Sequence, residues 1–371
     1  MTQGEIEIQL LAVVVAAACA LPGTFLVLRQ MAMMSDAISH AILPGIVIAF
    51  FLTHNLNSPL LILAAAATGV LTVMLVELLM STRLVREDAA IGLTFPVLFS
   101  IGIILIARYA GDVHLDTDAV LLGEPAFAPF DRLIVGGRDI GPRALYVMSG
   151  VGLANVAFIA LFYKELKIAT FDAGLAAALG FGPVLIHYGL MTFVSITAVA
   201  AFDAVGSILV VAMMVAPSAA AYLLTDRLRD MILLSVALGA ASAVGGFQMA
   251  RLFDVSIAGA MATVSGIVFL SVWLGAPRYG ILAGRQRRIR QKWEFAEKML
   301  AIHLFNHEGL PEADIEHRIG HLEEHLAWER DFARRVVRRA QSNGLVRQVD
   351  DDMLVLTPRG REAASEAIEN L

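Results

Sequence analysis

Residues 8–28 read IQLLAVVVAAACALPGTFLVL, an unbroken apolar run in which Gln9 is the most polar side chain. A helix needs about 20 such residues to cross the hydrocarbon layer of a bilayer. Comparable runs follow at residues 40–54, 59–80, 91–109, 144–163, 188–202, 206–224, 231–250 and 256–275. The second and sixth runs are short and have Gly or Pro neighbours, so the pattern fits eight, nine or ten spans. It predicts an all-α polytopic membrane protein.

The composition agrees with exposure to lipid. Of the 371 residues, 58% are hydrophobic and 17% are charged, and the mean hydropathy is +0.71. Soluble domains are about half apolar and about a quarter charged. The single cysteine, Cys19, excludes an intrachain disulfide and argues against a cysteine metal site. No basic region precedes the first run, so residues 8–28 are predicted to be a retained span and not a signal peptide.

Lysine and arginine gather on alternate connections between the predicted spans. The richer set carries Arg29, Arg83, Arg86, Lys164, Lys167, Arg227, Arg229 and the basic run from Arg278 to Lys292. In the opposite set, the connections 55–58 and 203–205 carry none. Cytoplasmic loops are enriched in positive charge. We therefore expect the N-terminus outside, the C-terminus in the cytoplasm and the connection 110–143 outside.

The composition changes at residue 278. Residues 285–371 hold 15 Lys and Arg residues and 16 Asp and Glu residues, with no membrane-length run. Apolar spacing predicts helices in residues 293–307, 312–328 and 331–343, then two short strands, 345–349 and 353–357, around the acidic turn 350–352. This order is typical of a winged helix. The predicted domains are a transmembrane domain (1–277), a basic linker (278–292) and a cytoplasmic winged-helix-like domain (293–371).

Residues 28–45 read LRQMAMMSDAISHAILPG and place two metal-ligand types at the edge of an apolar run. Asp36 and His40 are four residues apart, so a helix brings their Cβ atoms to about 5–6 Å on one face. Ionisable residues in a membrane span are costly and point to function. The alternative is a structural Asp–His pair at the membrane edge. Spacing alone leaves both interpretations open, because two ligands do not fill a coordination shell.

Several ordered segments resemble the manganese/zinc/iron permease family of ABC transporters. Residues 23–31 (GTFLVLRQM) and 35–45 (SDAISHAILPG) resemble the family signature. Three further segments resemble family segments in the same order: 86–92 (REDAAIG), 164–180 (KELKIATFDAGLAAALG) and 204–220 (AVGSILVVAMMVAPSAA). The resemblance covers roughly residues 8–276. It implies that the transmembrane domain (1–277) is a permease domain and that the protein lies in a bacterial plasma (inner) membrane.

The resemblance implies a metal pathway at the interface of two permease subunits. Asp36 and His40 match the family's metal-coordinating Asp and His, and two such pairs would supply four ligands. The cargo implied is a divalent metal and no tightly bound cofactor is expected. The segment SHAILPG resembles the manganese and iron members more than the zinc members. This favours manganese as the cargo, with zinc or iron as alternatives. The implied partners are a second permease subunit, the same or paralogous, and an extracytoplasmic metal-binding protein.

The energy for transport is expected to come from another chain. The sequence contains no Gly-Lys pair and hence no phosphate-binding loop of the Gly-x-x-x-x-Gly-Lys type, so the chain is predicted to be a transport subunit and not an enzyme. Residues 170–180 are predicted to form one short amphipathic helix that docks into an ABC ATPase. The residues assigned to this contact are Thr170, Phe171, Asp172, Leu175, Leu179 and Gly180. The alternative is an ordinary connecting helix.

Three other ionisable residues lie near predicted span ends. Asp203 is expected in a short outer turn, where a solvated turn residue is favoured over a weak metal or pathway ligand. Glu77 is near the inner end of its span, and His187 is at a span start that faces the cytoplasm. Both are interpreted as interfacial residues.

The tail has one basic helical face, formed by Arg334, Arg335, Arg338 and Arg339. Residues 344–347 and 354–360 resemble the wing of metal-responsive repressors. A membrane-bound transcription or signalling protein is therefore the alternative from another class. The tail is balanced in charge, however, and acids at the turn 350–352 would repel phosphates, so nucleic acid is not the favoured partner. Contact with the ATPase or the paired permease, or sensing of cytoplasmic metal, is preferred.

Overall fold

The computed structural model describes residues 2–54, 58–109, 125–136, 138–311, 313–349 and 352–369. The chain divides into two compact units, Met1–Gly280 and Ile281–Leu371, which are treated separately below. The acidic and histidine-containing stretch 112–124 of the predicted outer connection lies outside the described residues, as do positions 350 and 351 of the predicted acidic turn.

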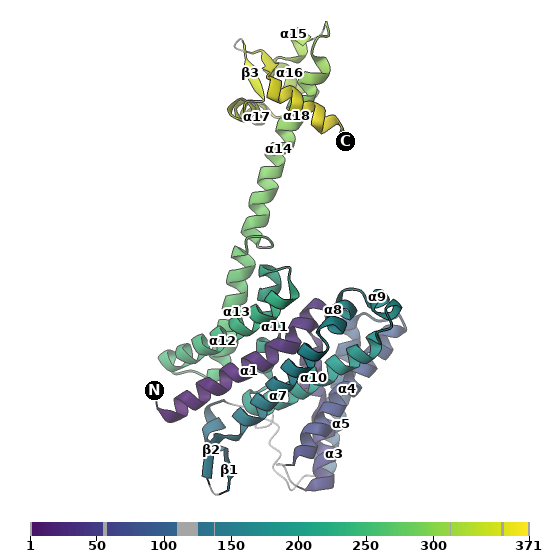
Figure 1. The fold of residues 1–371 in the computed structure, drawn as a ribbon, viewed down its shortest axis with the longest axis vertical. Coiled ribbons are helices and arrows are strands. Elements are labelled where there is room, and N and C mark those ends of the chain that lie inside the picture. Colours follow the sequence, from purple (N-terminus) through teal and green to yellow (C-terminus); the bar gives the residue numbers. More distant parts are fainter. Residues whose placement is uncertain are drawn as a thin grey trace. The chain divides into compact units, whose positions relative to one another are not determined.

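The first unit is built of helices (Figure 1). They are α1 (Gln3–Leu28), α2 (Met34–Ala41), α3 (Leu43–Thr53), α4 (Pro59–Ser81), α5 (Glu87–Tyr109), α7 (Arg143–Leu161), α8 (Tyr163–Phe171), α9 (Ala173–Ala178), α10 (Pro183–Val205), α11 (Ser207–Leu224), α12 (Leu228–Phe253) and α13 (Ile257–Gly275). Within the described residues, nine helical segments are long and apolar enough to cross a membrane. The prediction of an all-α polytopic protein is confirmed.

The two short predicted spans have different structures. The second is a pair of helices, α2 and α3, that join at Ile42, with Pro44 in the first turn of α3. The sixth is one helix of 23 residues, because α10 starts five residues earlier than expected, at Pro183, and continues to Val205. The connection before α7 holds a 3-10 helix, η1 (Pro125–Phe130), and an antiparallel hairpin of β1 (Arg132–Val135) and β2 (Arg138–Pro142), which the sequence did not predict.

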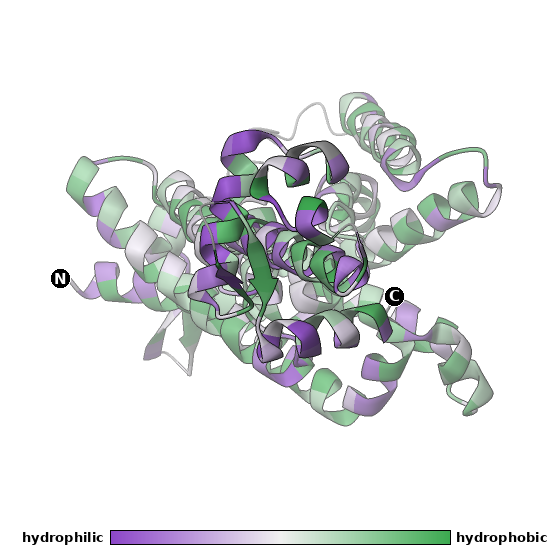
Figure 2. Cartoon of the chain, turned by 90° about the horizontal axis from the view of Figure 1, so that it is seen from above, coloured by the Kyte–Doolittle hydropathy of each residue, from purple (hydrophilic) through white to green (hydrophobic). Residues whose placement is uncertain are grey.

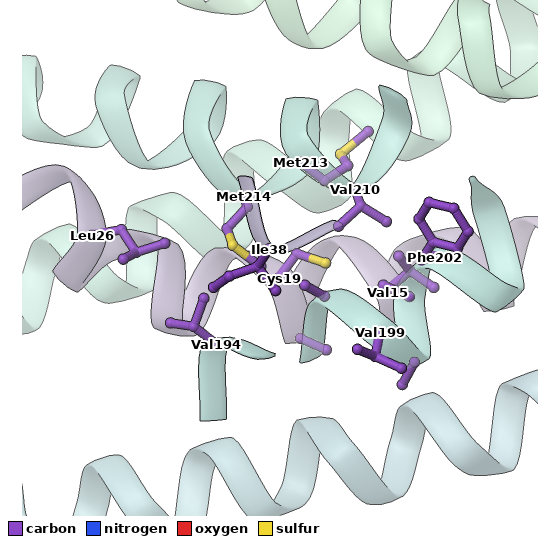
Figure 3. Close-up of a cluster of buried hydrophobic side chains, with 14 of the residues drawn as sticks. Val15, Cys19, Leu26, Ile38, Val194, Val199, Phe202, Val210, Met213 and Met214 are labelled. Atoms are coloured by element: carbon purple, nitrogen blue, oxygen red, sulfur yellow. The ribbon is translucent and has the colours of Figure 1, made fainter. Parts of the chain in front are cut away.

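Helix α1 lies at the centre of the first unit and packs against α7, α10, α11 and α12. Figure 3 shows part of this core, where Val15 and Cys19 of α1 meet Val199 of α10 and Met214 of α11. A Cβ atom added to Gly23 would lie 2.0 Å from the Met214 carbonyl oxygen, so only glycine allows α1 and α11 to approach this closely. Small residues commonly permit such contacts between membrane helices.

The second unit has its own hydrophobic core. Its elements are α14 (Ile281–His307), α15 (Ala313–Glu316), α16 (Ile319–His325), α17 (Arg330–Ser342), β3 (Val346–Gln348), β4 (Leu354–Leu356) and α18 (Pro358–Glu369). Leu300, Leu304, Leu322, Val336 and Leu354 are among its buried residues. In Figure 2, hydrophobic green dominates the long helices of the first unit, whereas hydrophilic purple is frequent in the second.

The tail elements differ in part from those predicted. Helix α17 and the antiparallel pair β3–β4 lie where the sequence placed a helix and two strands. The prediction of one helix over 312–328 is wrong, because α15 and α16 are separated at His317 and Arg318. Residues 281–292, expected as a linker, lie within α14, and α18 was not predicted. The winged-helix assignment stays a prediction.

Candidate metal pathway and coupling segment

Asp36 and His40 lie on one face of α2. The Nε2 atom of His40 is 3.5 Å from Oδ1 of Asp36, and the two side chains are 32% and 42% exposed for His40 and Asp36, respectively. The His40 ring also lies 5.9 Å, between centroids, from the ring of Phe95 on α5. The predicted pairing on one helical face is therefore present, and both side chains remain accessible.

The opposite face of α2 is anchored in the protein. Met34, Ala37, Ile38 and Ala41 are all fully buried, and α2 packs against α4, α5, α10 and α11. Since one face is fixed by these apolar contacts, the donors at positions 36 and 40 are held in place on the other. This arrangement leaves room for a ligand from outside the chain.

The Pro-Gly pair after the histidine fixes how α3 enters the bundle. A Cβ atom on Gly45 would lie 2.1 Å from Oγ1 of Thr68 and 2.5 Å from the carbonyl oxygen of Ala64, both on α4. Pro44 suits the first turn of α3, where its missing N–H has no helical partner. The residues that follow His40 in the signature therefore serve packing, and they hold α2 and α3 against α4.

Asp203 lies within α10 and not in a turn, so that part of its prediction is wrong. The helix continues past Asp203 and ends at Gly206, which has a φ of 83°. Its side chain is exposed, whereas its neighbours Phe202 and Ala204 are buried. Asp203 is on a different helix from Asp36 and His40.

The predicted coupling segment, residues 170–180, is not one helix: it holds the end of α8 and the whole of the short helix α9. Helix α8 ends at Phe171, and Asp172 caps α9 by accepting a hydrogen bond from the Leu175 backbone N–H at 2.8 Å. Asp and Asn are preferred at such caps because their side chains satisfy a free amide. Gly180, with a φ of 82°, follows the C-terminal end of α9. The expectation of one continuous helix over residues 170–180 is wrong.

The coupling segment presents apolar side chains. Phe171, Leu175 and Leu179 are 62%, 50% and 56% exposed. Phe171 also borders a cavity of about 170 Å³ that Leu28, Tyr222 and Met231 help to line. Three exposed large apolar side chains within nine residues form a surface suited to a protein partner.

A polar network joins this segment to the transmembrane helices, and sequence reasoning missed it. Nε of Arg29 donates to Oγ1 of Thr170 at 3.2 Å, and Nη1 of Arg29 lies 2.8 Å from Nδ1 of His187. His187 pairs in turn with Glu77, which also accepts a hydrogen bond from the Tyr188 hydroxyl at 2.7 Å. The network thus links the end of α8 to α4, α10 and the end of α1. The available signal was the placement of Arg29, Glu77 and His187 near span ends.

The basic face of α17 is partly used within the tail. Nε of Arg339 donates to Glu297 at 2.6 Å, and the guanidinium groups of Arg335 and Arg339 each lie 5.7 Å from the centroid of the Trp293 ring. Glu297 is 5% exposed. Because Arg339 is committed to this buried carboxylate, it is poorly placed to bind a phosphate.

Within the described residues, nine helical segments of membrane length, with α1 at their centre and an exposed apolar segment between two of them, define a multi-pass membrane protein. The chain belongs to the ABC 3 transport family, whose family model matches residues 6–275. It is thus an ABC permease subunit and not itself the ATPase. The resemblance found in the sequence is confirmed.

Individual relatives agree with this assignment. The chain is 45% identical to the zinc transport system membrane protein TroD of Treponema pallidum over 98% of both chains. It is 49% identical to the manganese transport system membrane protein MntD of Bacillus subtilis, over 76% of this chain and 96% of MntD. Its fold is similar to the structure of PsaBC from Streptococcus pneumoniae in complex with Fab, with 30% identity, a TM-score of 0.62, and coverage of 79% of this chain and 96% of that one.

Proposed function

We propose that manganese is the preferred substrate of this permease and that Asp36 and His40 bind the ion during transport. The chain is the permease of an ABC importer for a divalent metal. The observation that carries the proposal is the position of the pair: two metal donors on the accessible face of α2, whose other face is buried. A carboxylate and an imidazole suit manganese, zinc and iron(II). A second permease subunit would complete the shell with its own pair.

Manganese is proposed over zinc because the segment SHAILPG is closer to the manganese and iron members and because the identity to the manganese relative is 49% over 284 residues, against 45% over 363 residues to the zinc relative. Zinc is the alternative, and it is favoured by the relative that matches the whole chain, including the tail. The ligands alone do not separate these metals, because affinity for a given N/O site generally rises toward zinc and selection depends on geometry and availability.

The proposed partners follow from the surfaces described. An ABC ATPase would dock on the coupling segment, with Phe171 and Leu175 seated in a groove and Leu179 beside them. An extracytoplasmic binding protein would deliver the metal. The positive-inside pattern supports a chain with its N-terminus outside and its C-terminus in the cytoplasm. The tail, read as a winged-helix-like domain of residues 293–371, would contact the ATPase or permease, and nucleic acid is not favoured.

Metal uptake by single variants tests this function. Asp36→Asn keeps the side-chain volume and removes the anionic donor, while His40→Ala removes the imidazole. Each should abolish manganese uptake in cells that depend on this importer, with normal amounts of protein in the membrane. Asp254→Asn is the matched control: Asp254 is exposed, lies at the end of α12 with a φ of 52°, and Asn tolerates that conformation equally well. Normal uptake of manganese, zinc and iron by the first two variants would disprove the site.

A further inference from the structure

A group of histidines in the tail surrounds one buried carboxylate, and the proposed transport path does not use it. We call it the tail histidine cluster, and it comprises His303, His307, Glu316, His321 and His325. Three helices supply it: α14, α15 and α16. The ligand atoms of the first three residues lie within 4.8 Å of one another, and so do those of the last three, with Glu316 common to both groups.

Local sequence spacing explains why the four histidines form two pairs. His303 and His307 are four residues apart on α14, and His321 and His325 are four apart at the end of α16, so each pair shares one helical face. Two contacts bring the helices together: Nε2 of His317 lies 3.1 Å from the Leu304 carbonyl oxygen, and Nε2 of His303 lies 3.1 Å from the Glu316 carbonyl oxygen. The cluster is therefore held by the backbone of two helices.

The distances within the cluster match those between ligands of one metal ion. Oε2 of Glu316 lies 3.2 Å from Nε2 of His321 and 3.3 Å from Nδ1 of His325. The last two nitrogens are 3.3 Å apart. Ligand atoms held about 2.0–2.1 Å from a tetrahedral zinc ion are separated by about 3.3 Å.

Hydrogen bonding within the chain leaves this cluster incomplete. Oε2 of Glu316 and Nδ1 of His307 are buried, and neither makes a hydrogen bond to any described residue. Glu316 itself is 8% exposed and His303 is 7% exposed. A buried polar atom without a partner is costly, and a buried carboxylate normally has a paired charge or a metal. A cation at the centre of the cluster would satisfy both atoms.

We propose that the tail histidine cluster binds one divalent transition-metal ion, with zinc as the best-suited metal. Imidazole nitrogens with one carboxylate oxygen favour zinc and its neighbours over magnesium or calcium, which prefer oxygen ligands. The ion joins α14, α15 and α16 and so makes the tail more rigid when metal is abundant. The site is separate from Asp36 and His40 and does not depend on their role.

His325 is half exposed and offers the ion a route from solvent.

Zinc titration of the full-length chain in detergent tests the proposal. The protein is purified through a tag without histidines and carries Asp36→Asn and His40→Ala, so that the proposed transport site is silent. We expect one equivalent of zinc to bind, and cobalt(II) to give the intense visible absorption of a tetrahedral site. Zinc should also protect the segment 313–330 from limited proteolysis.

Variants in this background locate the ion. Altering a group that merely supports a ligand costs about 10–100-fold in affinity, so His325→Gln and Glu316→Gln should each raise the zinc Kd by roughly tenfold or more. Asp314→Asn removes an exposed carboxylate from the same helix as Glu316 and should leave binding unchanged. His325 is half exposed, so its variant remains decisive if Glu316→Gln fails to fold. Absence of zinc binding, or equal affinity with and without His325, would overturn the proposal.

Discussion

The two groups of candidate metal ligands differ in how much of the site one chain supplies. In the membrane unit, Asp36 and His40 come from a single helix, and each is about a third exposed or more. In the tail, four histidines from two helices surround the carboxylate of Glu316 on a third helix, and Glu316 is 8% exposed. A transport site has to accept and release its ion at each cycle, so donors divided between subunits suit it. Donors supplied by one chain suit an ion that stays.

The same contrast applies to protein contacts. The coupling segment exposes Phe171, Leu175 and Leu179, whereas the tail closes its own core around Leu300 and Leu354. The transport region is therefore built to be completed by partners, and the tail is largely complete in itself. The four predictions below test this difference, from the largest expected effect to the smallest.

The largest effect is expected at Asp36 and His40, where one chain supplies only part of the proposed site. A chain carrying both Asp36→Asn and His40→Ala should transport no more and no less metal than either single variant, because ligands of one shell act together. Radioactive manganese uptake measures this. A structural pair would instead show lost expression that the double variant partly restores. The exposure of the pair makes that outcome unexpected, because exposed ion pairs contribute only about 0–1 kcal/mol.

The next effect concerns the coupling segment. Phe171→Asp places a charge on the surface predicted to enter the ATPase, so the ATPase should no longer co-purify and transport should stop, while the permease still inserts. Leu84→Asp is the control, since Leu84 is 88% exposed on a different connection, between α4 and α5. Full retention of the ATPase by the Phe171 variant would refute the assignment.

A smaller effect is expected from removing the tail. Deletion of residues 285–371 should leave the permease assembled with its ATPase but alter its regulation or lower its stability. Co-purification measures assembly with the ATPase, and the response of uptake to rising zinc measures regulation. If an isolated 285–371 fragment bound promoter DNA tightly at physiological salt, with a steep salt dependence, the favoured view of the tail would be wrong.

The smallest effect is expected at the cap of α9. Asp172→Ala removes the acceptor for the Leu175 amide, which typically costs about 0.5–2 kcal/mol, whereas Asn is an equally good cap. Uptake should therefore fall several-fold with Ala and stay near normal with Asn. A strong loss with Asn as well would mean that the charge of Asp172, and not its cap, contacts the ATPase.

The sequence predicted what depends on local spacing. Apolar runs located the nine helical segments of membrane length within the described residues, although the short runs left a count of eight to ten open, and the four-residue interval placed Asp36 and His40 on one face. A break between two helices was missed where only one residue indicated it. Asp172, a residue type preferred at helix caps, separates α8 from α9, whereas the sequence predicted one helix up to Gly180. That signal was readable in the sequence.

Other features depend on contacts between distant residues. The break between α15 and α16 accompanies the contacts of His303 and His317 with backbone oxygens 13 residues away. The two histidine pairs were visible as four-residue intervals, but only the folded tail brings Glu316 between them. The Arg29–His187 contact joins residues separated by 158 positions, so no local pattern could have shown it.

The burial of Cys19 in the core beneath α10 and α11 has a practical consequence. The only thiol of the chain is fully buried, so a maleimide reagent added to the folded protein should ignore it. Single cysteines can therefore be introduced and labelled without first replacing Cys19. A cysteine placed at Leu175 would carry a single fluorescent or spin label, and one at Asp254 would report on a different connection. Distances between such labels in paired subunits could follow the transport cycle without replacing any core residue.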